Sequence, residues 1–129
     1  MEPLVIIPAR GGSSRIPRKN IKMFNGSAMI RWPISAALAC VPGPNVIVST
    51  EDPDVASIAL ASGATVPFTR PASLSDDYAG TAPVIVHALD ALNIKGQTLV
   101  MCLYPTAPVS SSTVSRAFDL AQAHPDKFV

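Results

Sequence analysis

A basic loop rich in small residues follows the first apolar run of the chain. Residues 9–20 read ARGGSSRIPRKN and combine two adjoining glycines, two serines and four cations. Glycines let backbone N–H groups approach an anion closely, serine hydroxyls donate further hydrogen bonds, and arginine offers a planar fork of donors that fits phosphate oxygens. The composition predicts a polyphosphate site, with a plain solvated surface loop as the alternative.

The loop matches neither of two familiar glycine-rich nucleotide motifs. It lacks the GxxxxGK[ST] spacing of a Walker A loop and the GxGxxG spacing of a dinucleotide-binding fold. A NAD-binding Rossmann domain is therefore disfavoured. The position of the loop directly after an apolar run still favours a functional role, because ligand-binding loops follow buried strands in α/β folds.

The positive charge of the chain is local. Residues 1–31 carry six cations and one acid, whereas the rest of the chain carries four cations and eight acids. The net charge of +1 argues against a general nucleic-acid binder and against a membrane-surface protein, which both need a basic excess. A basic-loop RNA-binding domain is the weakest alternative, and a small anionic ligand is the expected partner.

The composition is that of a globular domain or a piece of one. Of 129 residues, 48% are hydrophobic and 15% are charged. Cys40 and Cys102 have neither zinc-ribbon nor disulfide-framework spacing, and Cys102, within an apolar run, is expected to be a buried thiol. No signal peptide and no bilayer-spanning run are recognised, so a cytoplasmic protein is expected.

Short apolar runs alternate with helical periodicity along the chain. Strands are expected at 3–8, 45–50, 64–68 and 98–104. A first helix is expected within 27–40, and Pro33 makes it regular only from about Trp32. A second is expected from the Asp52-Pro53 cap to Gly63. Two further helices are expected, one from a Thr81 cap to 93 and one from a Ser112 or Thr113 cap to about Ala123. This order predicts an α/β fold with a mainly parallel sheet.

Parallel strands bring their following loops to one edge of the sheet. Three such loops, 9–26, 50–52 and 105–112, are expected at the carboxyl ends of the strands, where ligands bind in open α/β sheets. The basic loop is one of them, which strengthens its interpretation as a binding element.

Three stretches in order carry a family resemblance. They are IPARGGSSRIPRKNIKMFNG (7–26), GATVPFTRPASLSDDYAGTAPVIVHAL (63–89) and LYPTAP (103–108). Together they resemble the acylneuraminate cytidylyltransferase family, and most closely its branch that uses pseudaminic acid. The resemblance covers almost the whole chain. It implies a Rossmann-like three-layer α/β sandwich of the nucleotidyltransferase type, with residues 1–129 as the N-terminal nucleotide-binding part of one domain whose C-terminal half is missing.

The resemblance also implies a reaction, in which CMP passes from CTP to a nonulosonic (nine-carbon keto-sugar) acid and pyrophosphate leaves. Pseudaminic acid is the first expectation for the sugar, and N-acylneuraminic acid is the alternative. A truncated, non-catalytic nucleotide-binding module remains a further alternative. Mg²⁺ is the implied cofactor, with ligands expected in the missing half. The full-length form is implied to be a homodimer, without nucleic-acid or membrane partners.

The implied site residues fall into three groups. The implied nucleotide site consists of Ala9, Arg10, Gly11, Gly12, Ser13, Arg15, Lys19, Asn20, Arg70 and Thr81. Within it, the residues implied to face the triphosphate are Arg10, Ser13, Arg15 and Lys19, of which Arg10 and Lys19 are implied to be catalytic. The residues implied to contact the cytidine are Asn20, Arg70 and Thr81. The implied sugar-acid pocket consists of Tyr104, Thr106 and Ala107.

Two positions depart from the family pattern, and several others have structural interpretations. Ser14 stands where the family usually has lysine, and Pro33 stands where it tends to have serine. Asp52 is interpreted as a helix cap and His87 as a packing histidine. No residue of the sequence is assigned to a metal.

Overall fold

A computed structural model describes residues 3–11, 19–24, 26–75, 80–94, 98–106 and 109–124, and for Lys19 the backbone alone. Among these residues it has four α-helices, three short 3-10 helices, a three-stranded sheet and a two-stranded hairpin. Five residues for which the sequence makes a prediction lie outside the described residues: Gly12, Ser13, Ser14, Arg15 and Ala107.

The main sheet is parallel, as predicted. It consists of β1 (Leu4–Pro8), β4 (Val46–Ser49) and β5 (Val100–Cys102), in the order β4-β1-β5. Ile6 of the central strand is in register with Ile47 on one side and with Cys102 on the other. The runs predicted as strands at 3–8, 45–50 and 98–104 are therefore confirmed.

The fourth predicted strand, 64–68, is reduced to a single bridge. Thr65 lies beside β4, where its N–H donates to the Val46 carbonyl at 2.8 Å and its carbonyl accepts from the Val48 N–H at 2.9 Å. Pro67 follows two residues later and has no N–H to continue a ladder. The segment extends the outer edge of the sheet without becoming a full strand.

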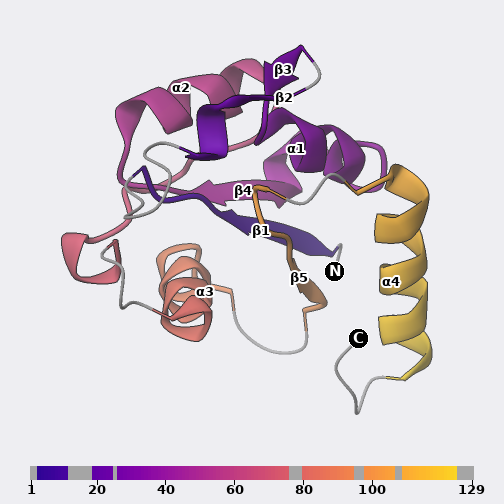
Figure 1. The fold of residues 1–129 in the computed structure, drawn as a ribbon. Coiled ribbons are helices and arrows are strands. Elements are labelled where there is room, and N and C mark those ends of the chain that lie inside the picture. Colours follow the sequence, from indigo (N-terminus) through magenta and orange to yellow (C-terminus); the bar gives the residue numbers. More distant parts are fainter. Residues whose placement is uncertain are drawn as a thin grey trace.

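The helices lie on both faces of the sheet and form the predicted three layers. In Figure 1, α1 and α2 cover one face, α3 covers the opposite face, and α4 stands beside the sheet. The helices are α1 (Arg31–Leu38), α2 (Pro53–Ala61), α3 (Thr81–Ala91) and α4 (Ser111–Ala123), and the 3-10 helices are η1 (Lys19–Ile21), η2 (Gly43–Asn45) and η3 (Ala72–Leu74). Pro33 lies in the first turn of α1, where a missing N–H costs little.

The two faces of β1 define two apolar clusters. Val5 and Ile7 point into the larger one, which also contains Ile30, Ile34 and Val55. Ile6 points to the opposite face, where it packs with Ile47 and Ala88. Because side chains alternate along a strand, burial on both faces explains why β1 is an uninterrupted apolar run.

One predicted helix cap is confirmed and two are wrong. Asp52 caps α2, and its carboxylate accepts from the Asp54 N–H at 2.8 Å. Gly80, not Thr81, is the N-cap of α3, and the Thr81 side chain is engaged elsewhere. Ser110, not Ser112 or Thr113, caps α4 by accepting from the Thr113 N–H. Neighbouring Ser and Thr residues compete for this role, so composition alone does not select the cap.

A small hairpin falls inside the segment predicted as a loop over 9–26 and just beyond it. It consists of β2 (Met23–Phe24) and β3 (Ser27–Ala28), and Gly26 in the turn has a φ of +87°. Trp32 of α1 supports it, because its indole N–H donates to the Phe24 carbonyl at 2.9 Å and the two rings meet edge to face. Two-residue strands of this kind leave almost no periodic signal in a sequence.

The predicted burial of Cys102 is wrong, and the interpretation of His87 is confirmed. Cys102 ends the outer strand β5 and is exposed, although partial burial raises the pKa of its thiol. The His87 ring packs edge to face against Phe68, with ring centroids 5.0 Å apart. No helix among the described residues is long and apolar enough to cross a membrane.

Candidate functional site

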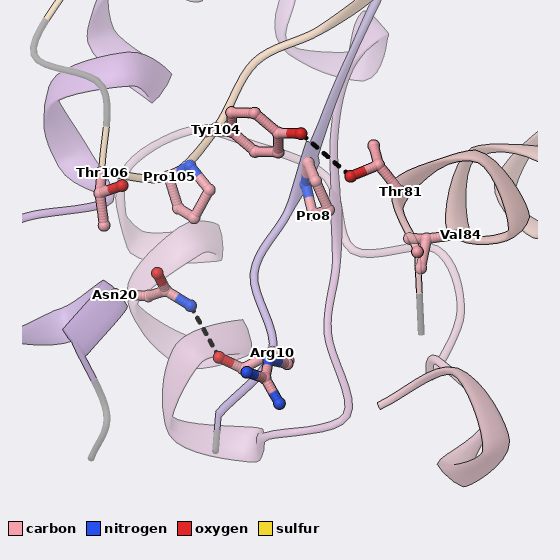
Figure 2. Close-up of a pocket in the computed structure, with 9 residues that line it drawn as sticks. Pro8, Arg10, Asn20, Thr81, Val84, Tyr104, Pro105 and Thr106 are labelled. Carbon is pink, nitrogen blue, oxygen red and sulfur yellow. Dashed lines mark hydrogen bonds between the residues drawn. The ribbon is translucent and has the colours of Figure 1, made fainter. Parts of the chain in front are cut away.

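A pocket opens where β1 and β5 end and α3 begins (Figure 2). Its volume is about 330 Å³, which lies at the lower end of the range for small-molecule sites. The strand order brings its walls together from segments far apart in the sequence. The lining residues are Pro8, Arg10, Asn20, Gly80, Thr81, Val84, Tyr104, Pro105 and Thr106.

The basic loop is closed at its base by a hydrogen bond. The side-chain amide of Asn20 donates to the Arg10 carbonyl at 2.7 Å (Figure 2). Asn20 is only 2% exposed, and its Oδ1 has no hydrogen-bond partner among the described residues. A buried acceptor without a partner is costly unless a ligand or water satisfies it. Asn20 therefore offers the pocket a hydrogen-bond acceptor.

A second hydrogen bond crosses the opposite wall of the pocket. The hydroxyls of Thr81 and Tyr104 lie 3.0 Å apart and link the first turn of α3 to the segment after β5 (Figure 2). Gly80 makes no side-chain cap for the helix. The N-terminus of α3, which carries a partial positive charge, lines the same pocket as Arg10 through Gly80 and Thr81.

Arg70 lies apart from this pocket. Its guanidinium is buried and donates to Ser49 Oγ at 3.2 Å, to the Ser49 carbonyl at 2.8 Å and to the Leu74 carbonyl at 3.3 Å. Burial lowers the pKa of Arg70, Glu51 opposes this change, and Arg10 adds to it. The side chain joins the end of β4 to the segment before η3, and its predicted contact with cytidine stays a prediction.

Two acidic residues meet the start of the basic loop. The Gly11 N–H donates to Glu51 Oε1, and a side-chain carbon added at Gly11 would lie 2.2 Å from Asp52 Oδ2. The sequence predicts no role for Glu51 and, for Asp52, only that of a helix cap. A usable signal was available, since both residues directly follow the strand that neighbours β1 in a parallel sheet.

The structure brings together five of the predicted site residues. Arg10, Asn20, Thr81, Tyr104 and Thr106 line one pocket. Ala9 is buried in the larger apolar cluster, and the Gly11 N–H donates to Glu51. The side chain of Lys19 and all of Gly12, Ser13, Arg15 and Ala107 fall outside what the structure describes.

Among the described residues, no carboxylate lines this pocket. Glu51 and Asp52 line a different groove, beside α2 and the 66–69 segment. Within the described ranges no three His, Cys, Asp or Glu side chains gather as a metal site would require. The acids of the described chain therefore do not form a Mg²⁺ site at the pocket, since protein-bound Mg²⁺ takes one or two carboxylates beside phosphate oxygens.

Comparison with known proteins gives the family. Residues 4–127 match the family described as cytidylyltransferase. A pseudaminic acid cytidylyltransferase of Campylobacter jejuni is 42% identical, over 100% of this chain and 54% of that protein. A CMP-N,N'-diacetyllegionaminic acid synthase of Legionella pneumophila is 35% identical, over 84% of this chain and 47% of that protein. The chain thus spans about half the length of these curated relatives.

A solved structure supports the fold. A CMP:2-keto-3-deoxy-manno-octonic acid synthetase complexed with CTP superimposes with a TM-score of 0.78, at 24% identity, over 98% of this chain and 49% of that one. This similarity shows that the two chains share a fold. The family match covers nearly the whole chain, so the chain belongs to the cytidylyltransferase family.

Proposed function

We propose that this chain is the nucleotide-binding part of an enzyme that transfers CMP from CTP to a nonulosonic acid, with pseudaminic acid as the preferred sugar. The 42% identity to a pseudaminic acid cytidylyltransferase supports this choice over N-acylneuraminic acid. The observation that carries the proposal is the pocket in which Arg10, Asn20 and Thr81 meet at the ends of β1 and β5.

Each wall of the pocket suits one part of the two substrates. Arg10 and the basic loop supply positive charge for the triphosphate. The buried Oδ1 of Asn20 is an acceptor for the cytosine amino group or a ribose hydroxyl. Tyr104 and Thr106 offer hydroxyls at the side of the pocket on which the hydroxylated sugar acid would lie.

The reaction is an in-line displacement at phosphorus. The anomeric hydroxyl oxygen of the sugar bonds to the α-phosphorus of CTP, the bond to pyrophosphate breaks, and the hydroxyl proton is released. In such a transfer the protein contributes position and charge stabilisation more than covalent chemistry. Arg10 and Lys19 are the residues we assign to the triphosphate charge.

We include Mg²⁺ as the cofactor of the proposed reaction, and we assign none of its ligands to the described residues. It would supply counter-charge to the phosphate oxygens. Because no acid of the described residues lines the pocket, we expect the protein ligands of Mg²⁺ outside the described part of the chain. We further propose that the whole enzyme is a cytoplasmic homodimer.

A non-catalytic nucleotide-binding module is the second candidate. Among the described residues no carboxylate lines the pocket, and a module that only binds CTP needs none. A CMP-transfer assay separates the two, because the module binds CTP without forming a CMP-sugar.

The test is calorimetric titration of the chain with CTP, UTP, ATP and GTP, with and without Mg²⁺. We expect selective CTP binding. Arg10→Ala should weaken it about ten- to hundredfold, since charge-assisted hydrogen bonds are lost. Arg31→Ala is the matched control, because Arg31 is an exposed cation on α1. Equal affinity for all four nucleotides would overturn the proposal.

A further inference from the structure

The first residues of the basic loop are attached to the neighbouring strand by an acidic side chain. Glu51 follows β4, and its Oε1 accepts the Gly11 N–H across a separation of 40 residues. The corner that carries Glu51 is itself held, because the Asp52 N–H donates to Thr50 Oγ1 at 3.1 Å. The loop therefore begins from a fixed point on the sheet.

Close packing reinforces this attachment. A side-chain carbon at Gly11 would lie 2.2 Å from Asp52 Oδ2 and 2.5 Å from Asp52 Cβ, so this position has room only for glycine. The sequence predicts that Gly11 allows close approach to a phosphate. In the structure its N–H and its missing side chain both serve contacts with residues 51 and 52.

The opposite end of the loop is fixed by a separate contact. Asn20 donates to the Arg10 carbonyl at 2.7 Å, which brings residues 10 and 20 together. The loop is thus held at its base by Asn20 and tied to β4 by Glu51. Such ties reduce the ordering cost that a bound anion would otherwise impose on the loop.

The charge of Glu51 lies among cations. Burial lowers the pKa of Arg70, the negative charge of Glu51 opposes this change, and Arg10 adds to it, so the three charged groups lie close enough to interact. Glu51 Oε2 is buried and has no hydrogen-bond partner among the described residues. The carboxylate lies outside the pocket that Arg10 lines, and Glu51 lines the separate groove beside α2.

We propose that Glu51 is a positioning residue for the triphosphate. It acts through Gly11, by setting where the basic loop starts, and makes no contact with the nucleotide. The inference rests on the proposed function, since it assumes that the loop binds the triphosphate of CTP. An acceptor oxygen is what the Gly11 N–H needs, so glutamine can replace Glu51 and alanine cannot.

The test compares CTP with cytidine, which has no phosphates, on the 129-residue chain. Glu51→Ala should weaken CTP binding at least about tenfold. The Gly11 N–H would lose its charged acceptor, and the loss of one such hydrogen bond has an effect of this size. The affinity of this variant for cytidine should stay within about twofold, and Glu51→Gln should bind CTP within about threefold of the native chain. Asp90→Ala, which removes an exposed acid of α3, is the matched control.

Three outcomes overturn the inference: unchanged CTP affinity in Glu51→Ala, an equal loss for cytidine and CTP, or a Gln variant as weak as the Ala variant. If Glu51→Ala does not fold, Glu51→Asp takes its place, because its shorter side chain withdraws the carboxylate from Gly11.

A separate measurement distinguishes failure of this inference from failure of the proposed function. Hydrogen exchange of the Gly11 amide needs no ligand and should be faster in Glu51→Ala than in Glu51→Gln. If the native chain does not bind CTP selectively, the proposed function is wrong, whatever the exchange rate of the Gly11 amide. Equal Gly11 exchange in the two variants would overturn the positioning role by itself.

Discussion

Arg70 shows how a single residue can stabilise a site without lining it. Its guanidinium donates hydrogen bonds to the Ser49 hydroxyl, the Ser49 carbonyl and the Leu74 carbonyl, and the residue is 4% exposed. The Ser49 carbonyl ends β4, next to the corner that holds Glu51. A buried guanidinium is stable in such a place because carbonyl oxygens satisfy it and Glu51 lies nearby.

Replacing Arg70 should therefore cost stability. We expect Arg70→Met to lower the free energy of unfolding by about 2–4 kcal/mol, because buried carbonyl groups lose their donors. Arg70→Lys should recover only part of this, since an ammonium cannot reproduce the fork. Urea denaturation measures both. Arg116→Met, at an exposed position of α4, is the control and should change the value by less than about 0.5 kcal/mol. Unchanged stability in Arg70→Met would show that the side chain is not structural.

At the scale of elements, α2 and α3 end in the same way. The Gly63 N–H donates to the Leu60 carbonyl and the Ala64 N–H to the Ala59 carbonyl, both at 3.1 Å. After α3, Asn93 takes the place of Gly63, with a φ of +56° against +99°. This paired arrangement satisfies the last carbonyls of a helix and requires a left-handed residue.

Gly63→Ala should destabilise the chain by about 1–2 kcal/mol, because an L side chain is strained in the left-handed region. The new carbon would also lie 3.0 Å from Leu38 Cδ1. Gly63→Asn should cost less, since asparagine already performs this role at position 93. Thermal and urea unfolding of the two variants give the comparison. If the alanine variant were as stable as the native chain, the helix end would not depend on this conformation.

For the whole molecule, the outer strand β5 is the least covered part of the main sheet. It pairs with β1 on one side and, among the described residues, with no strand on the other. Large apolar side chains are also exposed elsewhere, among them Met23 at 70% and Val86 at 56%. Open strand edges and uncovered apolar surface favour association between copies.

We therefore expect the 129-residue chain to self-associate in reducing buffer as its concentration rises. Size-exclusion chromatography with light scattering measures the mass. Cys102→Lys, a charge on the outer strand, should shift the chain toward monomer. Leu120→Lys, at an exposed position of α4, is the matched control and should leave the association unchanged. A monodisperse monomer at every concentration would contradict the prediction.

Local pattern determined much of this protein. Uninterrupted apolar runs specify β1 and β4, and the Asp52-Pro53 pair specifies the start of α2. The rule that loops gather at the carboxyl ends of parallel strands placed Arg10 and Thr106 at one site. The strands and the helix start depend on residues close together in the chain, and the shared site follows from a general rule for parallel sheets, so the sequence alone predicts them.

The tertiary structure decided which partners those residues have. Glu51 meets Gly11, Arg70 meets Ser49, and Thr81 meets Tyr104 across 40, 21 and 23 residues. Each pairing follows from the strand order β4-β1-β5 and from the helix that crosses between strands. Hydrophobic periodicity predicts which face of an element is buried. It does not predict the segment against which that face packs. For that reason the contacts that hold the loop, and the exposure of Cys102, became visible only in the folded chain.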